Sequence, residues 1–222
     1  MEERRFDVVN RETPRLESYE KALGSGKYTD DLSVPGMVYA ELVRSPYSHA
    51  KVLSIDTSEA EKVPGYLGCA LPEDSPQMYF NCSGNPPSPL LMADEKVLTD
   101  EPLVLGDRVA VVAAETEEAA HAAAEAVKVE YEVIQPMLDV KAALAPNAPA
   151  LQPHIAPDNI VQRRDVAQGD IAAGEAASDI IVEDHFVTPA MQHTTIELTS
   201  CICDFSDGEH ITIYSCSQTV FQ

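Results

Sequence analysis

The stretch of residues 105–134 constrains the fold of this chain more than any other part of the sequence. Its first part, Val109–Ala114, is an unbroken run of small and β-branched residues, which is typical of a strand buried on both faces. Its last part alternates apolar and charged residues through Val129, Tyr131 and Val133, and this pattern predicts a strand with one solvent-exposed face. Two such strands cannot bury their faces alone, so we expect the other strands of the sheet to come from elsewhere in the chain.

A helix is predicted between these two strands. Thr116 can cap its first turn, and Glu117 and Glu118 follow where the positive end of the helix dipole favours anions. Small apolar side chains recur at helical spacing and form one narrow stripe, which consists of Ala119, Ala120, Ala123, Ala126 and Val127. His121 and Glu125 fall outside this stripe. We therefore expect the alanine face, with position 123 at its centre, to pack against a sheet.

The composition excludes several classes of partner. A net charge of −22 on 222 residues argues against nucleic acid and against anionic membranes, because both need clustered Lys and Arg. No apolar run approaches about 18 residues, and the start of the chain lacks the apolar core of a secretory signal. Five cysteines without a framework spacing fit a reducing compartment, so we expect a cytoplasmic protein.

The N-terminal half is predicted to begin with an extended leader at residues 1–17 and an entry loop at residues 18–36. Ser58 and Glu61 can form the capping box of a short helix. Residues 72–94 are rich in Pro, Ser, Asn and Gly, which indicates a long surface excursion. Three further strands are predicted in this half, at Met37–Val43, Ala50–Ile55 and Tyr66–Leu71.

The C-terminal half is predicted to begin with a semi-rigid extended linker, because four prolines follow one another at close intervals between Pro146 and Pro157. Asp207-Gly208, between two alternating apolar runs, predicts a β-hairpin. The chain ends directly after a strand, so we expect the second domain to be incomplete. The elements expected in this half are short helices at Val140–Leu144 and Gly169–Asp179, and strands at Ile180–Val187, Thr195–Phe205 and His210–Ser217.

Candidate chemical residues are few. Cys201 and Cys203 would point to the same face of a strand, but a metal site would need a second pair of ligands, so we expect buried packing cysteines. Cys216 has no evident activating partner, which argues against a nucleophile. His193, with Glu197 nearby, is the best candidate for a site, although a hydrogen-bonded structural histidine is the more ordinary interpretation. Motif chemistry alone assigns no catalytic residue and no metal ligand in this chain.

Three stretches nevertheless resemble one enzyme family. The first stretch runs from Glu20 to Ala50. It includes the segment Glu20–Asp31, then PGMVYA, and ends with RSPYSHA. The central unit contributes GDRVA and AAET, and the last stretch contributes TPAMQH, Glu197 and SCSQ at residues 215–218. In this order they resemble the molybdenum-binding subunit of the xanthine dehydrogenase and aldehyde oxidase family over about residues 11–222.

The resemblance implies an α+β fold in three parts after the leader. These are an α/β-hammerhead domain at 18–135, a Pro-rich linker at 136–160, and an incomplete mixed α/β molybdopterin-binding region at 161–222. It also implies a molybdenum hydroxylase that inserts water-derived oxygen into a purine, another N-heterocycle or an aldehyde. Electrons would pass to [2Fe-2S] and FAD on partner subunits. Gln218 matches the family's glutamine that hydrogen-bonds an oxygen ligand of molybdenum in the molybdopterin-type cofactor, although Cys216 and Ser217 replace the usual Ser-Thr before it.

The sequence departs from the family pattern in length. The family's glycine-rich Gly-Gly-Phe-Gly-Gly loop and the late glutamate that serves as general base are both missing. We therefore expect the cofactor to be shared with the remainder of the molybdenum-binding subunit, and the isolated chain to be inactive. Two origins remain open, a natural split subunit or a truncated fragment, and the alternative function is a non-catalytic hammerhead module that docks an iron–sulfur or flavin subunit.

Overall fold

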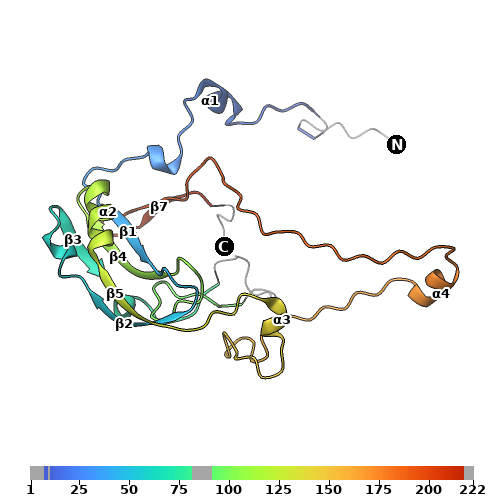
Figure 1. Cartoon of the computed structure of the whole chain (residues 1–222). Helices are drawn as coiled ribbons and strands as arrows, with labels where there is room; N and C mark the ends of the chain where they lie inside the picture. The colour runs from blue at the N-terminus through green and yellow to red at the C-terminus, as the bar shows by residue number, and fades with distance from the viewer. Residues whose placement is uncertain (1–7, 10, 82–91, 218–222) are drawn as a thin grey trace. The chain divides into compact units, whose positions relative to one another are not determined.

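The computed structural model describes residues 8–9, 11–81 and 92–217 and divides into two units (Figure 1). The larger unit contains the described part of residues 36–188. The smaller unit contains the described parts of residues 1–35 and 189–220.

A three-stranded antiparallel sheet forms the centre of the larger unit. Strand β4 (Arg108–Ala114) lies between β1 (Tyr39–Arg44) and β3 (Tyr66–Ala70), so both of its edges are paired. Successive residues of a strand face opposite sides of the sheet. Val109 and Ala110 are both fully buried, which confirms the prediction of a strand buried on both faces.

A second sheet in the same unit pairs β2 (Ala50–Asp56) with β5 (Lys128–Val133) in antiparallel fashion. Its register shifts between Val52 and Ser54, which leaves Leu53 as a bulged, exposed residue. The alternation predicted for β5 holds for the half-buried Val129 and Tyr131. It fails at Val133, which is mostly exposed at the end of the strand.

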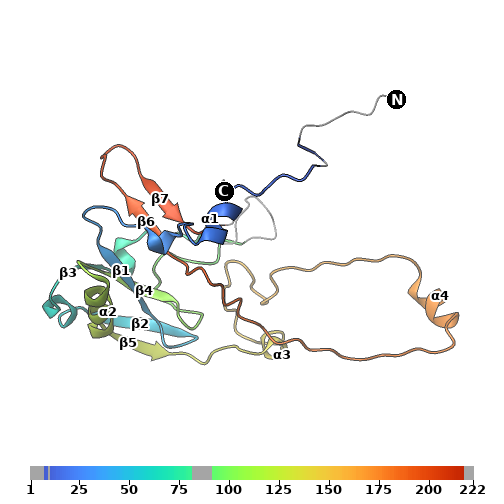
Figure 2. The same ribbon diagram turned by 90° about the horizontal axis from the view of Figure 1, so that it is seen from above.

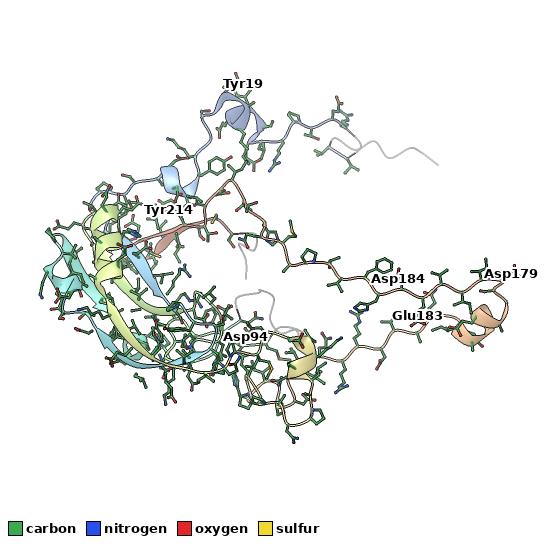
Figure 3. All side chains as sticks on the ribbon, viewed as in Figure 1. Tyr19, Asp94, Asp179, Glu183, Asp184 and Tyr214 are labelled. Atoms are coloured by element: carbon green, nitrogen blue, oxygen red, sulfur yellow. The ribbon has the colours of Figure 1, made fainter. Side chains whose placement is uncertain are left out.

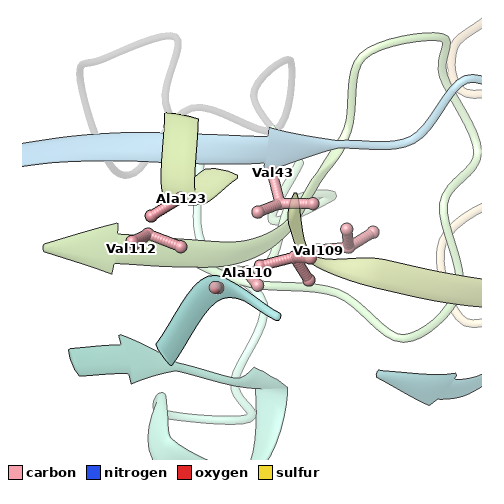
Figure 4. Packing of buried hydrophobic residues seen from close by; sticks show 7 residues of the cluster. Val43, Val109, Ala110, Val112 and Ala123 are labelled. Carbon is pink, nitrogen blue, oxygen red and sulfur yellow. The ribbon is translucent and has the colours of Figure 1, made fainter. Parts of the chain in front are cut away.

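Helix α2 (Glu117–Ala126) packs on the three-stranded sheet, chiefly on β1 and β4. Thr116 caps it as predicted, because its Oγ1 accepts a hydrogen bond from the backbone N–H of Ala119 at 3.1 Å. Ala123 is fully buried and points toward Val112 of β4 in a cluster of small apolar side chains (Figure 4). The small side chains let the helix approach the sheet closely.

Two predictions near the N-terminus are wrong. The expected entry loop contains helix α1 (Ser18–Leu23), which ends at Gly24 in the left-handed conformation with φ 70°. The expected short helix is one 3₁₀ turn, η2 (Ala60–Lys62), and Ser58 is not its cap. Two further 3₁₀ turns are present, η1 (Thr29–Asp31) and η3 (Pro72–Asp74).

The Pro-rich segment is not extended as predicted. After α3 (Val140–Ala143) the chain turns back on itself through residues 144–159. Asn159 holds these turns together: its Oδ1 accepts from the N–H of Leu151 at 2.9 Å, and its Nδ2 donates to the carbonyls of Ala143 and Pro149, both at 3.0 Å.

This folded segment also contacts the earlier part of the unit. The ring of His154 stacks on Tyr79 with centroids 4.2 Å apart, and Gln152 Nε2 donates to the carbonyl of Asp94 at 2.8 Å. Proline prevents regular secondary structure here but does not prevent packing. We call residues 144–160, with these contacts, the proline clasp.

Beyond the proline clasp, the chain forms only α4 (Ile171–Ala176) before residue 188, flanked by extended single segments (Figures 1 and 2). The strand predicted at Ile180–Val187 is not formed, because this run has no neighbouring strand to pair with in the described part of the chain. The side chains of its acidic residues Asp179, Glu183 and Asp184 project from the segment (Figure 3).

The smaller unit contains a two-stranded hairpin of β6 (Cys201–Asp204) and β7 (Thr212–Ser215), both shorter than predicted. The predicted turn is confirmed, since Gly208 adopts φ 73° between the strands. Asp207 orders the loop, because its carboxylate accepts from the N–H groups of Glu209 and His210 at 3.0 and 2.7 Å. In the described ranges of the chain, no helix is both long and apolar enough to cross a membrane.

Candidate functional site

The GDR sequence at residues 106–108, one of the stretches that carries the family resemblance, forms a structural turn. Gly106 adopts φ 91°, a conformation that glycine tolerates without strain. The Oδ2 atom of Asp107 accepts hydrogen bonds from the backbone N–H groups of Leu103 and Val104 at 2.7 and 2.9 Å. The acidic residue therefore closes the loop that leads into β4.

Arg108 fixes a second loop against the same strand. Its Nη2 donates to Glu95 Oε2 at 2.8 Å and to the carbonyl of Lys96 at 3.0 Å, while its Nε donates to the carbonyl of Val97 at 3.1 Å. A guanidinium group suits this task because its donors are arranged in a rigid fork. These side chains position the loops of the larger unit.

The RSPYSHA stretch joins the two sheets of the larger unit. Arg44 donates to the carbonyl of Gly106 at 3.0 Å, and the rings of Tyr47 and Tyr131 meet edge to face with centroids 5.3 Å apart. Burial raises the pKa of the Tyr131 phenol. The Nδ1 atom of His49 is buried and has no hydrogen-bond partner among the residues that the structure describes.

A groove of about 380 Å³ lies on the larger unit between β1, α2 and β5. Its lining includes the apolar side chains of Val43, Val127 and Val129. His121 and Glu125 also line it; both side chains are exposed, and His121 Nε2 lies 3.6 Å from Glu125 Oε1. Exposed groups of this kind are not held in the buried, preorganised geometry that catalysis requires.

The residues singled out in the last stretch of the sequence lie in the smaller unit. His193 and Glu197 are both exposed, so the expected structural role of the histidine as a packed, hydrogen-bonded residue is not seen. Gln218, the one residue to which the resemblance gives a cofactor contact, lies outside the described residues. Of these three residues, the structure describes only His193 and Glu197, and both face solvent.

The expectation of buried packing cysteines is wrong for Cys201 and Cys203. Both side chains emerge from β6 on the same face, as predicted, but that face is exposed. Their Sγ atoms lie 3.9 Å apart. Cys216 is half-buried beside them, and its Sγ contacts the carbonyls of Leu198 and Ser200 at 3.6 and 3.7 Å.

The described residues do not enclose a molybdenum cofactor. Nearly every side chain from residue 161 to 217 is exposed, and the ranges that the structure describes hold no group of three or more His, Cys, Asp or Glu side chains able to bind a metal ion. A cofactor of this kind needs donors around it from several directions. We therefore derive no chemical step through it from this chain.

Comparison with known proteins now identifies the family. Residues 23–135, just over half of the chain, match the domain described as "Aldehyde oxidase and xanthine dehydrogenase, a/b hammerhead domain". The chain belongs to the xanthine dehydrogenase and aldehyde oxidase family. Residues 153–222 match a second domain family, described as "Molybdopterin cofactor-binding domain".

Individual relatives agree with this assignment. The chain is 32% identical over 208 residues to the "Xanthine dehydrogenase molybdenum-binding subunit" of Escherichia coli, covering 92% of this chain and 27% of the relative. It is 28% identical over 214 residues to the "Nicotinate dehydrogenase large molybdopterin subunit" of Eubacterium barkeri, covering 96% of this chain and 48% of the relative. The chain thus spans about a quarter to a half of the length of these curated family members.

A solved structure from the family shares the fold. Aldehyde oxidoreductase from Desulfovibrio gigas superposes with a TM-score of 0.78 at 28% identity, covering 91% of this chain and 23% of that one. The resemblance recognised in the sequence and the predicted α+β class with a hammerhead domain are therefore confirmed.

Proposed function

We propose that this chain supplies the hammerhead domain and the first part of the molybdopterin-binding region of a molybdenum hydroxylase. In this proposal the leader covers residues 1–17, the hammerhead domain 18–135, the Pro-rich linker 136–160 and the start of the molybdopterin-binding region 161–222. The matches to the two domain families, in the same order along the chain, support this division.

One observation carries the proposal: the two regions differ in how they bury apolar residues. The hammerhead region closes a core around Val109, Val112 and Ala123, whereas large apolar side chains of the later region face solvent. Burying one such side chain stabilises a protein by about 1.5–3 kcal/mol, so a surface of this kind calls for a protein partner. The exposed residues include Val161, Val166, Ile171, Ile180, Ile181, Val182, Phe186, Val187, Met191, Ile196 and Leu198.

The partner that fits this surface is the remainder of a molybdenum-binding subunit, which would complete the cofactor site. The assembled enzyme would hydroxylate a purine, another N-heterocycle or an aldehyde, take the oxygen from water, and pass two electrons to [2Fe-2S] and FAD subunits. The names of the relatives span this substrate range, from xanthine and nicotinate to aldehydes. The strongly acidic composition excludes a nucleic-acid role.

The test is reconstitution by co-expression. The tagged chain is produced with the remainder of the molybdenum-binding subunit and with the iron–sulfur and flavin subunits, and xanthine, nicotinate and an aldehyde are assayed in ¹⁸O-labelled water. We expect one complex, and turnover of at least one substrate with ¹⁸O in the product. A complex without turnover on any substrate class would instead support the non-catalytic docking module.

A matched pair of variants tests the surface that carries the proposal. Phe186→Glu places a charge where an exposed aromatic ring should become buried, and we expect it to prevent assembly. Thr188→Glu, two residues along the same exposed segment, introduces the same charge without removing a large apolar group. Equal yields of complex from both variants would contradict burial of this segment.

Gln218 is the residue of this chain that we propose to contact the cofactor. Its amide would donate a hydrogen bond to an oxygen ligand of the metal and hold that ligand in orientation. Removal of one preorganised donor typically lowers turnover by about 10²–10³. We expect Gln218→Ala in the assembled enzyme to show such a fall at unchanged molybdenum content, and Gln192→Ala, the matched control, to show none.

A further inference from the structure

Two thiols on the exposed face of β6 form an arrangement that the hydroxylase proposal does not use. Cys201 and Cys203 are two residues apart in a strand, so their side chains emerge on one face, and their Sγ atoms lie 3.9 Å apart. Both are reduced and exposed. We propose that this pair binds a single thiophilic closed-shell cation of the Zn²⁺ class through both sulfur atoms.

The distances favour a bridging cation over a disulfide. A disulfide needs sulfur atoms about 2.05 Å apart and Cα atoms within about 6.8 Å. Residues i and i+2 of an antiparallel strand are separated by about 6.8 Å, at the limit of that range. Closing the bond would shorten β6 and disturb its pairing with β7, in which Cys201 lies opposite Ser215 and Cys203 opposite Ile213.

The same distance suits a tetrahedral cation. Two Zn–S bonds of about 2.3 Å to sulfur atoms 3.9 Å apart would meet at about 116°, close to the tetrahedral angle. The cation can therefore enter without movement of the strand. Thiolate ligands select soft and borderline cations over Mg²⁺ or Ca²⁺, which prefer oxygen.

Electrostatics favours the same occupant. Two thiolates with sulfur atoms 3.9 Å apart would repel each other. A divalent cation removes this repulsion as it displaces two protons, one from each thiol. The net charge of −22 on the whole chain also favours cation approach.

Within the described part of the chain, two sulfur atoms are the whole protein contribution. Residues opposite the cysteines on the same face are Ser215 and Ile213, and Asp204 lies on the other face of β6. Across the ranges of the chain that the structure covers, no third His, Cys, Asp or Glu completes a metal-binding group. Water would fill the remaining positions, so the site is a weak, exchangeable one.

The experiment titrates the reduced full-length chain with Cd²⁺ alone, a cation of this class whose bond to thiolate absorbs in the ultraviolet. We expect a sulfur-to-cadmium band that saturates near one ion per chain and is displaced by Zn²⁺. Cys201→Ser and Cys203→Ser should each weaken binding at least tenfold. Cys69→Ser, which removes a half-buried thiol in the larger unit, should leave the titration unchanged.

Three results would overturn the proposal. One is the absence of a band from the wild-type chain when a thiol reagent shows that both cysteines are reduced. Another is wild-type binding by both β6 variants. The third is loss of binding in Cys216→Ser, since that would assign the ion to a different sulfur set. Circular dichroism of each variant distinguishes these results from unfolding, and none of them depends on hydroxylase activity.

Discussion

The side chain at position 123 sets how closely α2 approaches the sheet. Ala123 is fully buried against the cluster that contains Val43 and Val112. Ala123→Leu would insert extra methylene groups into this contact, and we expect it to destabilise the chain by about 1–3 kcal/mol in urea unfolding. Ala122→Leu, on the exposed side of the same helix, should change stability by less than about 0.5 kcal/mol. Equal losses from the two variants would contradict the packing described here.

Asp207 makes the hairpin loop sensitive to acid. The backbone N–H groups of His210 and Glu209, and then the His210 side chain, hold the pKa of Asp207 below its ordinary value. A carboxyl group with a lowered folded-state pKa stabilises the loop at pH above its ordinary value of about 3.9. This contribution is lost as the pH falls through the lower, folded-state pKa.

An NMR titration of the full chain checks this prediction. We expect the Asp207 carboxyl to titrate below about pH 3.9, and the amide signals of Glu209 and His210 to shift with it. Asp207→Asn should remove that pH-dependent shift, because its amide does not ionise in this range. An Asp207 pKa at or above the ordinary value would show that these hydrogen bonds do not persist in solution.

Among the elements, the proline clasp is the one that depends most on a single residue. Asn159 supplies three hydrogen bonds and also adopts φ 58°, a left-handed conformation in which asparagine and glycine are favoured. Asn159→Gly keeps the favourable backbone conformation but loses the side-chain bonds, whereas Asn159→Ala loses both. We expect faster hydrogen exchange at residues 149–160 in both variants, and the greater increase in the alanine variant. Unchanged exchange in both would show that the clasp is held by other contacts, such as the stacking of Tyr79 on His154.

Elements whose signals are local could be predicted from the sequence. The cap at Thr116, the alanine stripe around Ala123 and the glycine of the hairpin turn each act within a few residues, and the structure confirms them. The run at Ile180–Val187 shows the limit of such signals. Its β-branched residues favour a strand, but a strand also needs a neighbour, and the described chain provides none.

The candidate site was less predictable than the fold, because the surroundings of a side chain also depend on distant parts of the chain. The spacing of Cys201 and Cys203 correctly placed both thiols on one face, but spacing does not tell which face of a hairpin is covered. Helix α1 was missed because Gly24 suggests a loop, whereas here it ends a helix of six residues. The family resemblance, in contrast, rests on many positions in a fixed order, and comparison confirms it.

At the scale of the whole molecule, the two domain regions differ in how far they bury their apolar side chains. The hammerhead region has its own buried core, while the region that matches the molybdopterin-binding domain exposes large apolar side chains between residues 161 and 198. The central claim is therefore that this chain holds the molybdenum cofactor only together with the remainder of a molybdenum-binding subunit.

The molybdenum content of the chain, purified alone and after co-expression with that remainder, tests this claim most directly. Elemental analysis of both preparations, normalised to protein, is the measurement. We expect about one molybdenum atom per assembled complex and none in the chain alone, because the described residues provide no enclosed site. Stoichiometric molybdenum in the chain purified alone would contradict the claim.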